Sequence, residues 1–269
     1  MNRFSRFLAV LSLTIPATIV SASDDFGIWS SADFTKSLGS HFNVDAEVGF
    51  RSNNELQSVD RWDASLGLNY KPFKFFKLGI GYTYIYSRNA TESKPNYKND
   101  IEDFDHWVGY NITRPHWRSK NRLTFDATGT LNLGRLAFAL RERYQLTGYN
   151  GVHTMKDRYR FENTIDKTDL AYKDTRRDEK KAKTRHYLRS RIEAEYNIPK
   201  CKFTPFASYE FSNNLQDAFH LDKQRLSVGG EYKLSKQHRL SLAYIYDNGA
   251  DDDTESDIHV ISIGYKFKF

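Results

Sequence analysis

The chain has a single cysteine, Cys201, among its 269 residues, which excludes an intramolecular disulfide and any metal cluster built on cysteine. It has no run of 18 apolar residues, so helical membrane spans are excluded as well. Proline is scarce, with 6 residues, while aromatic residues make up 15% of the chain, and this composition fits a secreted protein rich in β-strands. The mean hydropathy of -0.69 does not argue against a membrane barrel, because only alternate residues of a barrel strand face lipid.

The last segment of the chain alternates between apolar and polar residues. Ile261, Ile263, Tyr265, Phe267 and Phe269 share one parity, and the residues between them are Ser, Gly and Lys. A period of two indicates a strand whose two faces meet different surroundings. Because the apolar face continues to the last residue, we expect a final strand that faces lipid in a bacterial outer membrane. Its aromatics, Tyr265, Phe267 and Phe269, resemble the assembly signal that the barrel-assembly machinery binds.

Residues 1–22 have the order of a secretory signal peptide. Two arginines precede an apolar stretch over residues 7–20, and small residues follow up to Ala22. This stretch is too short for a transmembrane helix. No cysteine follows Ala22 directly, so a lipoprotein anchor is not expected. We predict Sec-type export with cleavage near Ala22 and a mature barrel over residues 23–269 in the outer membrane of a Gram-negative cell; a buried N-terminal helix is the alternative.

Alternation recurs along the mature chain and predicts an all-β protein. Eleven segments are predicted to be strands, each close to the length that crosses a bilayer at a tilt. They are 26–38, 41–51, 60–70, 76–87, 121–131, 135–148, 184–198, 202–212, 223–233, 238–247 and 257–269. The predicted fold is therefore a transmembrane antiparallel β-barrel of 10–12 strands, and a soluble β-sandwich is the alternative.

The predicted connections alternate in length. Short turns fall at 71–75, 132–134, 199–201 and 234–237, whereas longer polar links fall at 52–59, 88–120, 149–183, 213–222 and 248–256. Outer-membrane barrels have short periplasmic turns and longer external loops, so the longer links are predicted to be external. This assignment requires residues 105–114, despite their strand-like pattern, to belong to an external loop. It also makes 26–38 an eleventh, descending strand, and whether the barrel has an odd or an even number of strands is left open.

The strand face opposite the aromatics is rich in charge. Parity places eight arginines and eight carboxylates in the lumen as a charge network: Asp45, Glu47, Arg51, Arg61, Asp63, Arg122, Asp126, Arg141, Arg143, Arg189, Arg191, Glu193, Glu195, Glu210, Arg225 and Glu231. Arginine forms planar, paired contacts with carboxylates. A barrel of this size has an interior wide enough only for side chains or a small ligand. We therefore favour a lumen filled by salt bridges, with a narrow, weakly selective pore and a specific ligand cavity as alternatives.

One predicted external link is basic. Residues 150–186 contain 11 Lys and Arg against 7 Asp and Glu, an excess of four positive charges. At the outer surface such a segment would lie beside the phosphates of lipopolysaccharide, which attract it by Coulomb interaction. A solvated loop without a partner is the alternative. A nucleic-acid partner is not expected, because the segment is predicted to lie outside the cell.

Signals for an enzyme are weak, and no catalytic, cofactor-binding or metal-binding residue is predicted. Outer-membrane phospholipases need Ser, His and an orienting group close together, but no His-x-Ser sequence occurs. Asp103 and Asp105, together with Asp257 and His259, match the spacings of an outer-membrane aspartyl-type protease. His259 shares the parity of the residues expected to face lipid, however, so an internal site is not expected. No cofactor is predicted.

Three segments carry a resemblance to a known family: DFGIW at 25–29, NRLTFDATGTLNLGR at 121–135 and LAFALRERYQ at 136–145. They resemble the uncharacterised barrel family known as domain of unknown function 2490. The resemblance extends from Asp25 to Phe269 and is most specific in the LRERYQ run, whereas the link 88–120 is longer than is usual. It implies an outer-membrane barrel and no activity, so no catalytic residue is carried over.

The sequence therefore leaves three hypotheses for function. The leading one is a small structural or interaction barrel with a charge-filled lumen. The second is a narrow, porin-like pore or transporter for small solutes. An outer-membrane hydrolase that acts on lipid or peptide is a third and disfavoured hypothesis.

Overall fold

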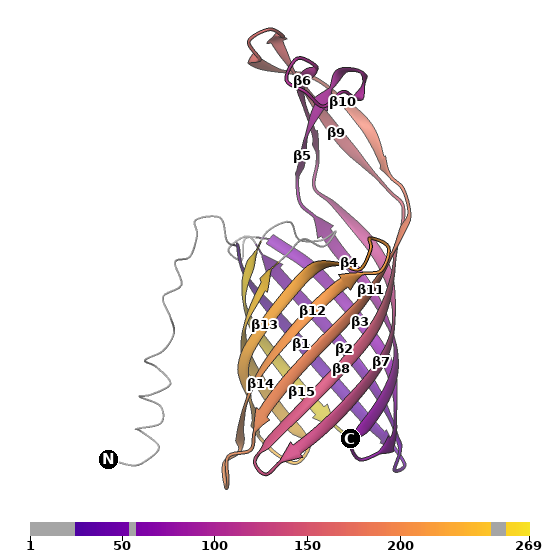
Figure 1. Cartoon of the computed structure of the whole chain (residues 1–269), viewed down its shortest axis with the longest axis vertical. Helices are drawn as coiled ribbons and strands as arrows, with labels where there is room; N and C mark the ends of the chain where they lie inside the picture. Colours follow the sequence, from indigo (N-terminus) through magenta and orange to yellow (C-terminus); the bar gives the residue numbers. More distant parts are fainter. Residues whose placement is uncertain (1–24, 54–57, 249–256) are drawn as a thin grey trace, which may run out of the picture.

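A computed structural model describes residues 25–53, 58–248 and 257–269, and it contains a closed barrel of eleven strands (Figure 1). The barrel strands are β1 (Asp25–Leu38), β2 (Phe42–Asn53), β3 (Ser58–Phe73), β4 (Phe76–Asn89), β7 (His116–Leu133), β8 (Leu136–Tyr149), β11 (Lys183–Tyr196), β12 (Phe203–Asn214), β13 (His220–Lys233), β14 (His238–Asn248) and β15 (Ile258–Lys268). Each overlaps a segment predicted from alternation, so the all-β barrel is confirmed. The predicted signal peptide, half of the link 52–59 and most of the link 248–256 lie outside the described residues.

The barrel closes through a parallel pair of strands, which corrects the expectation of a wholly antiparallel barrel. β1 pairs with β15 in parallel, with Ile28 opposite Ile261, whereas the other neighbouring pairs among the described strands are antiparallel. The physical reason is the strand number. When eleven strands alternate in direction, the first and the last run the same way, and only a parallel ladder can join them. Strand 26–38, which makes the number of strands odd, is therefore the strand that closes the barrel.

The short turns all lie at the end of the barrel where the chain terminates (Figure 1). Gly39, in the turn between β1 and β2, has φ of 71°, and Gly134, between β7 and β8, has φ of 63°. Glycine adopts this left-handed conformation without a steric penalty, so it permits the tight reversal that these two hairpins need.

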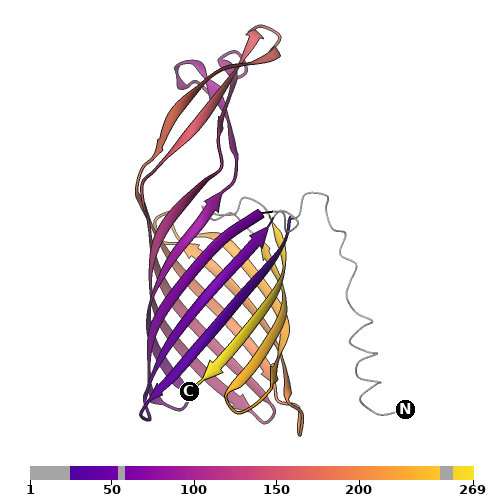
Figure 2. The ribbon, with the colours of Figure 1, turned by 180° about the vertical axis from the view of Figure 1, so that it is seen from behind.

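A second sheet of four strands extends from the opposite end of the barrel (Figure 2). Its order is β10-β9-β6-β5, and its strands are β5 (Glu92–Tyr97), β6 (Trp107–Thr113), β9 (Val152–Asn163) and β10 (Thr168–Lys180). A short 3-10 helix, η1 (Lys98–Asp100), follows β5. The strand-like segment 105–114 thus forms β6, outside the barrel. The links 88–120 and 149–183, expected to be loops, contain strands, and we call this four-stranded sheet the extension.

The extension is held by a small aromatic cluster and by ion pairs. Trp107 packs edge-on against Phe161, with ring centres 4.7 Å apart, and Phe161 is buried. On the neighbouring pair of strands, Arg158 donates two hydrogen bonds to Asp174, at 2.6 and 2.5 Å. Edge-to-face aromatic pairs and bidentate arginine–carboxylate pairs both fix geometry as well as adding stability. Within the described residues, no helix is long and apolar enough to cross a membrane.

The two faces of the barrel wall differ as the alternation predicted. Large apolar side chains lie on the outside, where Trp62 is 54% exposed, Leu66 63% and Leu242 59%. Side chains of the opposite parity face inward, where they line the cavities described below. The wall is therefore apolar outside and polar inside, and its interior is the place to look for a site.

Candidate functional site inside the barrel

Two adjoining cavities occupy the interior of the barrel. The larger has a volume of about 790 Å³ and is lined by residues from all eleven barrel strands, and the smaller has a volume of about 480 Å³. Six residues line both: Lys77, Arg141, Arg191, Phe206, Ser241 and Lys266. The larger volume lies within the range typical of small-molecule pockets, about 300–1,000 Å³.

The cavities succeed one another along the strands. On β14 the lining begins with Arg239 in the smaller cavity, passes through the shared Ser241, and ends with Asp247 in the larger one. On β11 it runs in the opposite chain direction, from Tyr187 in the larger cavity to Glu195 in the smaller. The open space therefore extends along most of the length of both strands, and the two cavities meet at the residues that they share.

All sixteen residues predicted to face the lumen line one or both of these cavities. Glu193, Glu195 and Glu231 line the smaller cavity, Arg141 and Arg191 line both, and the other eleven line the larger. Parity alone was enough to place them, because successive side chains of a strand point to opposite faces. The interior is charged, as expected, but it is not filled by its side chains.

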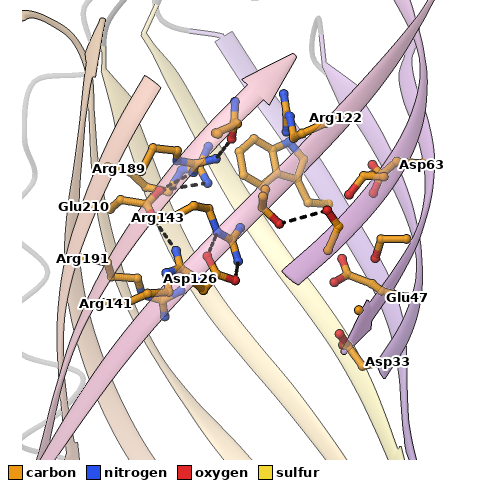
Figure 3. Close-up of a pocket in the computed structure, with 18 of the residues that line it drawn as sticks. Asp33, Glu47, Asp63, Arg122, Asp126, Arg141, Arg143, Arg189, Arg191 and Glu210 are labelled. Carbon is orange, nitrogen blue, oxygen red and sulfur yellow. Dashed lines mark hydrogen bonds and ion pairs between the residues drawn. The ribbon is translucent and has the colours of Figure 1, made fainter. Parts of the chain in front are cut away.

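One wall of the larger cavity is basic and tightly paired (Figure 3). Arg141 on β8 and Arg189 on β11 both donate to Glu210 on β12, the former at 2.5 Å. Arg143 donates to both oxygens of Asp126, at 2.5 and 2.9 Å. Arg191, on the same wall, pairs with Glu193.

These contacts join strands that are far apart in the sequence. Arg141 and Glu210 are 69 residues apart, and the pair spans β11, which lies between β8 and β12. Glu210 is buried and also lies 3.9 Å from Arg225. Buried carboxylates are stable as ions only when they are paired and hydrogen-bonded, and Glu210 satisfies this condition through arginines of three strands.

The facing wall is acidic and sparsely paired. Asp33 on β1 and Glu47 on β2 are direct cross-strand partners. Next to them, Asp45 accepts a hydrogen bond from Asn69. Within the described ranges, none of these three carboxylates forms an ion pair. By contrast, Asp63, on the same wall, accepts a hydrogen bond of 2.8 Å from Arg61. No group of three or more His, Cys, Asp or Glu side chains in the described ranges is arranged to hold a metal ion.

Three glycines lie on the inner face of β3 and β4, between these walls. Gly67 of β3 is the cross-strand partner of Gly81 of β4, and Gly79 lies on the same face of β4, two residues before Gly81. A side-chain carbon added at Gly67 would lie 3.5 Å from its nearest neighbouring atom, the backbone oxygen of Ile80. The absence of a side chain at Gly67 keeps space open beside the acidic residues, whereas the side chains of Asn69 and Thr124 lie over Gly79 and Gly81.

Sequence reasoning missed several residues that line the larger cavity. Trp29 and Asp33 were missed because the sequence analysis did not assign which face of strand 26–38 points into the barrel. Lys77, Lys266 and Asp247 were missed because they lie near strand ends, although their parity would have placed them inside. Trp29 is the most unusual of them, since it packs against buried Ile245, Ile258 and Val260 inside an otherwise polar lumen.

The residues considered for an enzyme do not form one site. Asp103 lies in the turn before β6 of the extension, where its carboxylate contacts His106 at 2.6 Å. His259 lies on β15 and hydrogen-bonds the hydroxyl of Tyr244 at 2.5 Å. Tyr244 is on the exposed outer face of the barrel, so His259 points outward, as its parity predicted.

Comparison with known proteins gives a family but no activity. No curated protein matches the chain. Among solved structures, a chain described as the CymD monoaromatic hydrocarbon channel is similar, with 10% sequence identity and a TM-score of 0.40, over 91% of this chain and 87% of that chain. The family model described as "Protein of unknown function (DUF2490)" matches residues 26–257. This match covers most of the chain, and the chain therefore belongs to that family of proteins of unknown function.

Proposed function

We propose that this protein is an outer-membrane barrel that conducts small polar solutes through its interior. The observation that carries the proposal is the pair of adjoining cavities, which are lined by polar side chains and extend along most of the barrel wall. A lumen completely filled by salt bridges would leave no such space. The narrow pore is therefore favoured over the filled barrel.

The proposed location rests on the outer surface of the barrel. Exposed aromatic and aliphatic side chains such as Tyr82, Tyr84 and Leu66 would be costly in water, whereas they are suited to lipid. A closed barrel also satisfies the backbone hydrogen bonds of every strand, which a lipid environment requires. Export by a signal peptide over 1–22 and recognition of Tyr265, Phe267 and Phe269 by the barrel-assembly machinery belong to the same proposal.

Ion conductance across a planar lipid bilayer tests the proposal directly. We expect purified protein to give stepwise, steady current in potassium chloride. Gly67→Trp is expected to reduce the current by about half or more, because the indole would occupy the larger cavity. Gly129→Trp is the matched control, since Gly129 has open space around it and the parity of the outward face. Absence of current above that of the bare bilayer would overturn the proposal.

A role in interaction is the second candidate, and the extension is the observation that favours it. Its order leaves β10 and β5 as edge strands, each with a row of backbone groups available for pairing. The basic residues of the segment 150–186 extend along β9 and β10, where lipopolysaccharide phosphates are the proposed partner. Deletion of residues 90–115 and 151–182 with short linkers, followed by measurement of lipopolysaccharide binding, tests this role separately from conductance.

A further inference from the structure

We propose that the larger cavity selects small zwitterions, with the solute's carboxylate on the arginine wall and its ammonium group on the acidic wall; this inference rests on the proposed pore. The two walls lie on opposite sides of the ring of strands. In the order β1-β15-β14-β13-β12-β11-β8-β7-β4-β3-β2, the acidic β1 and β2 are separated from the basic β8 and β11 by several strands in either direction. Figure 3 shows Asp33 and Glu47 facing Arg141 and Arg191 across open space.

The charges of the two walls are compensated to different degrees. Four arginines of the basic wall (Arg141, Arg143, Arg189 and Arg191) pair with three carboxylates (Asp126, Glu193 and Glu210), so one positive charge is in excess. In the described part of the chain, Asp33, Asp45 and Glu47 have no ion-pair partner. Asp33 and Glu47 hydrogen-bond each other, and the nearby cations Lys266, Lys77 and Arg51 interact with the acidic wall without forming an ion pair with its three carboxyl groups. The acidic wall thus keeps carboxylate charge without a contacting cation, the basic wall keeps an arginine in excess, and the field has a component across the lumen.

The chemistry of each wall fits one end of a zwitterion. A guanidinium has five N–H donors, and the hydrogen bonds of Arg143 and Arg191 use only some of them, so a carboxylate can still be bound. An ammonium group has three donors and no acceptor, and it would meet three carboxylates on the other side. A simple anion or a simple cation would be attracted to one wall and repelled by the other, whereas a zwitterion is attracted by both.

The space between the walls also suits such a solute. The cavity holds about 790 Å³, and Gly67 leaves part of its side wall without a side chain. A molecule the size of an amino acid can therefore turn its charges toward opposite walls without displacing a side chain. In this bound orientation the solute would lie perpendicular to the barrel axis, so the pore would select solutes by their charges as well as by their size.

Liposome swelling with a pair of isomers tests the inference. Alanine is a zwitterion, and lactamide has the same atoms without charges, so both carry no net charge and do not respond to a membrane potential. In proteoliposomes corrected for protein-free vesicles, alanine is expected to enter at roughly three times the rate of lactamide or faster, because of the Coulomb attraction at both walls. In the variant with Asp33→Asn, Asp45→Asn and Glu47→Gln, the ratio of the alanine rate to the lactamide rate is expected to fall to about one.

Controls separate this inference from the pore itself. Glu47→Asp keeps the charge and is expected to keep the preference for alanine, and circular dichroism checks that each variant retains its strands. Equal entry of both isomers into wild-type proteoliposomes would overturn zwitterion selection and leave the pore standing. A preference that survives the triple substitution would overturn the role of the acidic wall. Entry of neither isomer would overturn the pore, and the inference with it.

Discussion

The guanidinium of Arg51 lies over the indole of Trp29 inside the barrel, 3.9 Å from the ring centre. The two residues face each other on adjacent strands, because Trp29 of β1 is the cross-strand partner of Arg51 of β2. The guanidinium of Arg225, on β13, lies 4.8 Å from the same ring centre. Cation–π contacts of this kind are worth about 0.5–2 kcal/mol, more when they are shielded from water. Trp29 therefore holds two cationic side chains at the upper part of the cavity.

Removing this ring is expected to weaken the barrel and widen its lumen. Trp29→Ala should lower the free energy of unfolding by about 2 kcal/mol, since it removes both cation–π contacts and the packing against the apolar cluster. It should also raise single-channel conductance, because the indole lines the larger cavity. Denaturant titration in detergent and bilayer recording measure the two effects. Trp29→Phe keeps a ring and is the control; unchanged stability in Trp29→Ala would contradict this role.

Glu210 is expected to be the most sensitive carboxylate of the lumen. Glu210→Gln should destabilise the barrel by about 3 kcal/mol, because it leaves the partly buried arginines of β8 and β11 without their shared anion. Glu193→Gln is the comparison, since Glu193 lines the smaller cavity and has a single arginine partner, and it should cost less than about 1 kcal/mol. Equal losses in the two variants would show that the three-strand contact adds nothing beyond an ordinary ion pair.

The extension is expected to loosen only in strong acid. Hydrogen bonds from Arg158 lower the pKa of Asp174 from 3.8 to about 2, and hydrogen bonds from Arg114 and Thr175 lower the pKa of Asp157. A carboxylate whose pKa is lowered in the folded state adds stability above its unfolded pKa, and that stability is lost as the pH falls toward the folded value. Amide exchange in β9 and β10, corrected for the intrinsic rate, should be constant from pH 8 to about 5 and faster below about 4.

The matched variant for this experiment is Asp174→Asn. It removes the titrating partner of Arg158, so exchange in β10 should be faster at neutral pH and should change less between pH 5 and pH 2. Acceleration of the wild-type strands already near pH 6 would mean that another group controls the extension.

Alternation was enough to predict the barrel strands and their inward charges, because each barrel strand separates an apolar from a polar environment. The same reasoning missed β9 and β10. Both faces are polar over runs such as Lys156–Asp157–Arg158, and the apolar residues, among them Tyr159 and Phe161, form too short an alternation to mark whole strands. They are ordered by ion pairs, by pairing with each other and by the non-local pairing of β9 with β6, all of which depend on the folded register.

The sequence also could not predict which of the inward-facing charged residues pair with each other. Parity indicates that Arg141 and Glu210 face the lumen, but it cannot indicate that they meet, since their contact passes over β11. The separation into an acidic and a basic wall likewise follows from the strand order around the ring. That order depends on the parallel closure of β1 on β15, which alternation alone left open.

Cysteine cross-linking can test this closure. Ser30 and Ile263 are register partners across the parallel seam, and both have the outward parity. Backbone positions paired in this way are close enough for a disulfide, which needs α-carbons about 4.4–6.8 Å apart. In a Cys201→Ser background, Ser30→Cys with Ile263→Cys should therefore oxidise in most molecules. The bond would close a loop over most of the chain and change migration on a non-reducing denaturing gel.

The control shifts the register by one residue. Ser30→Cys with Ser262→Cys places one thiol outside the wall and the other inside, because neighbouring residues of a strand face opposite ways, and it should not cross-link. Cross-linking of the control but not of the paired positions would contradict the register. Failure of both pairs to cross-link would contradict the parallel pairing of β1 with β15. The barrel would then have an even number of strands without β1, and Asp33 of β1 would no longer belong to the acidic wall.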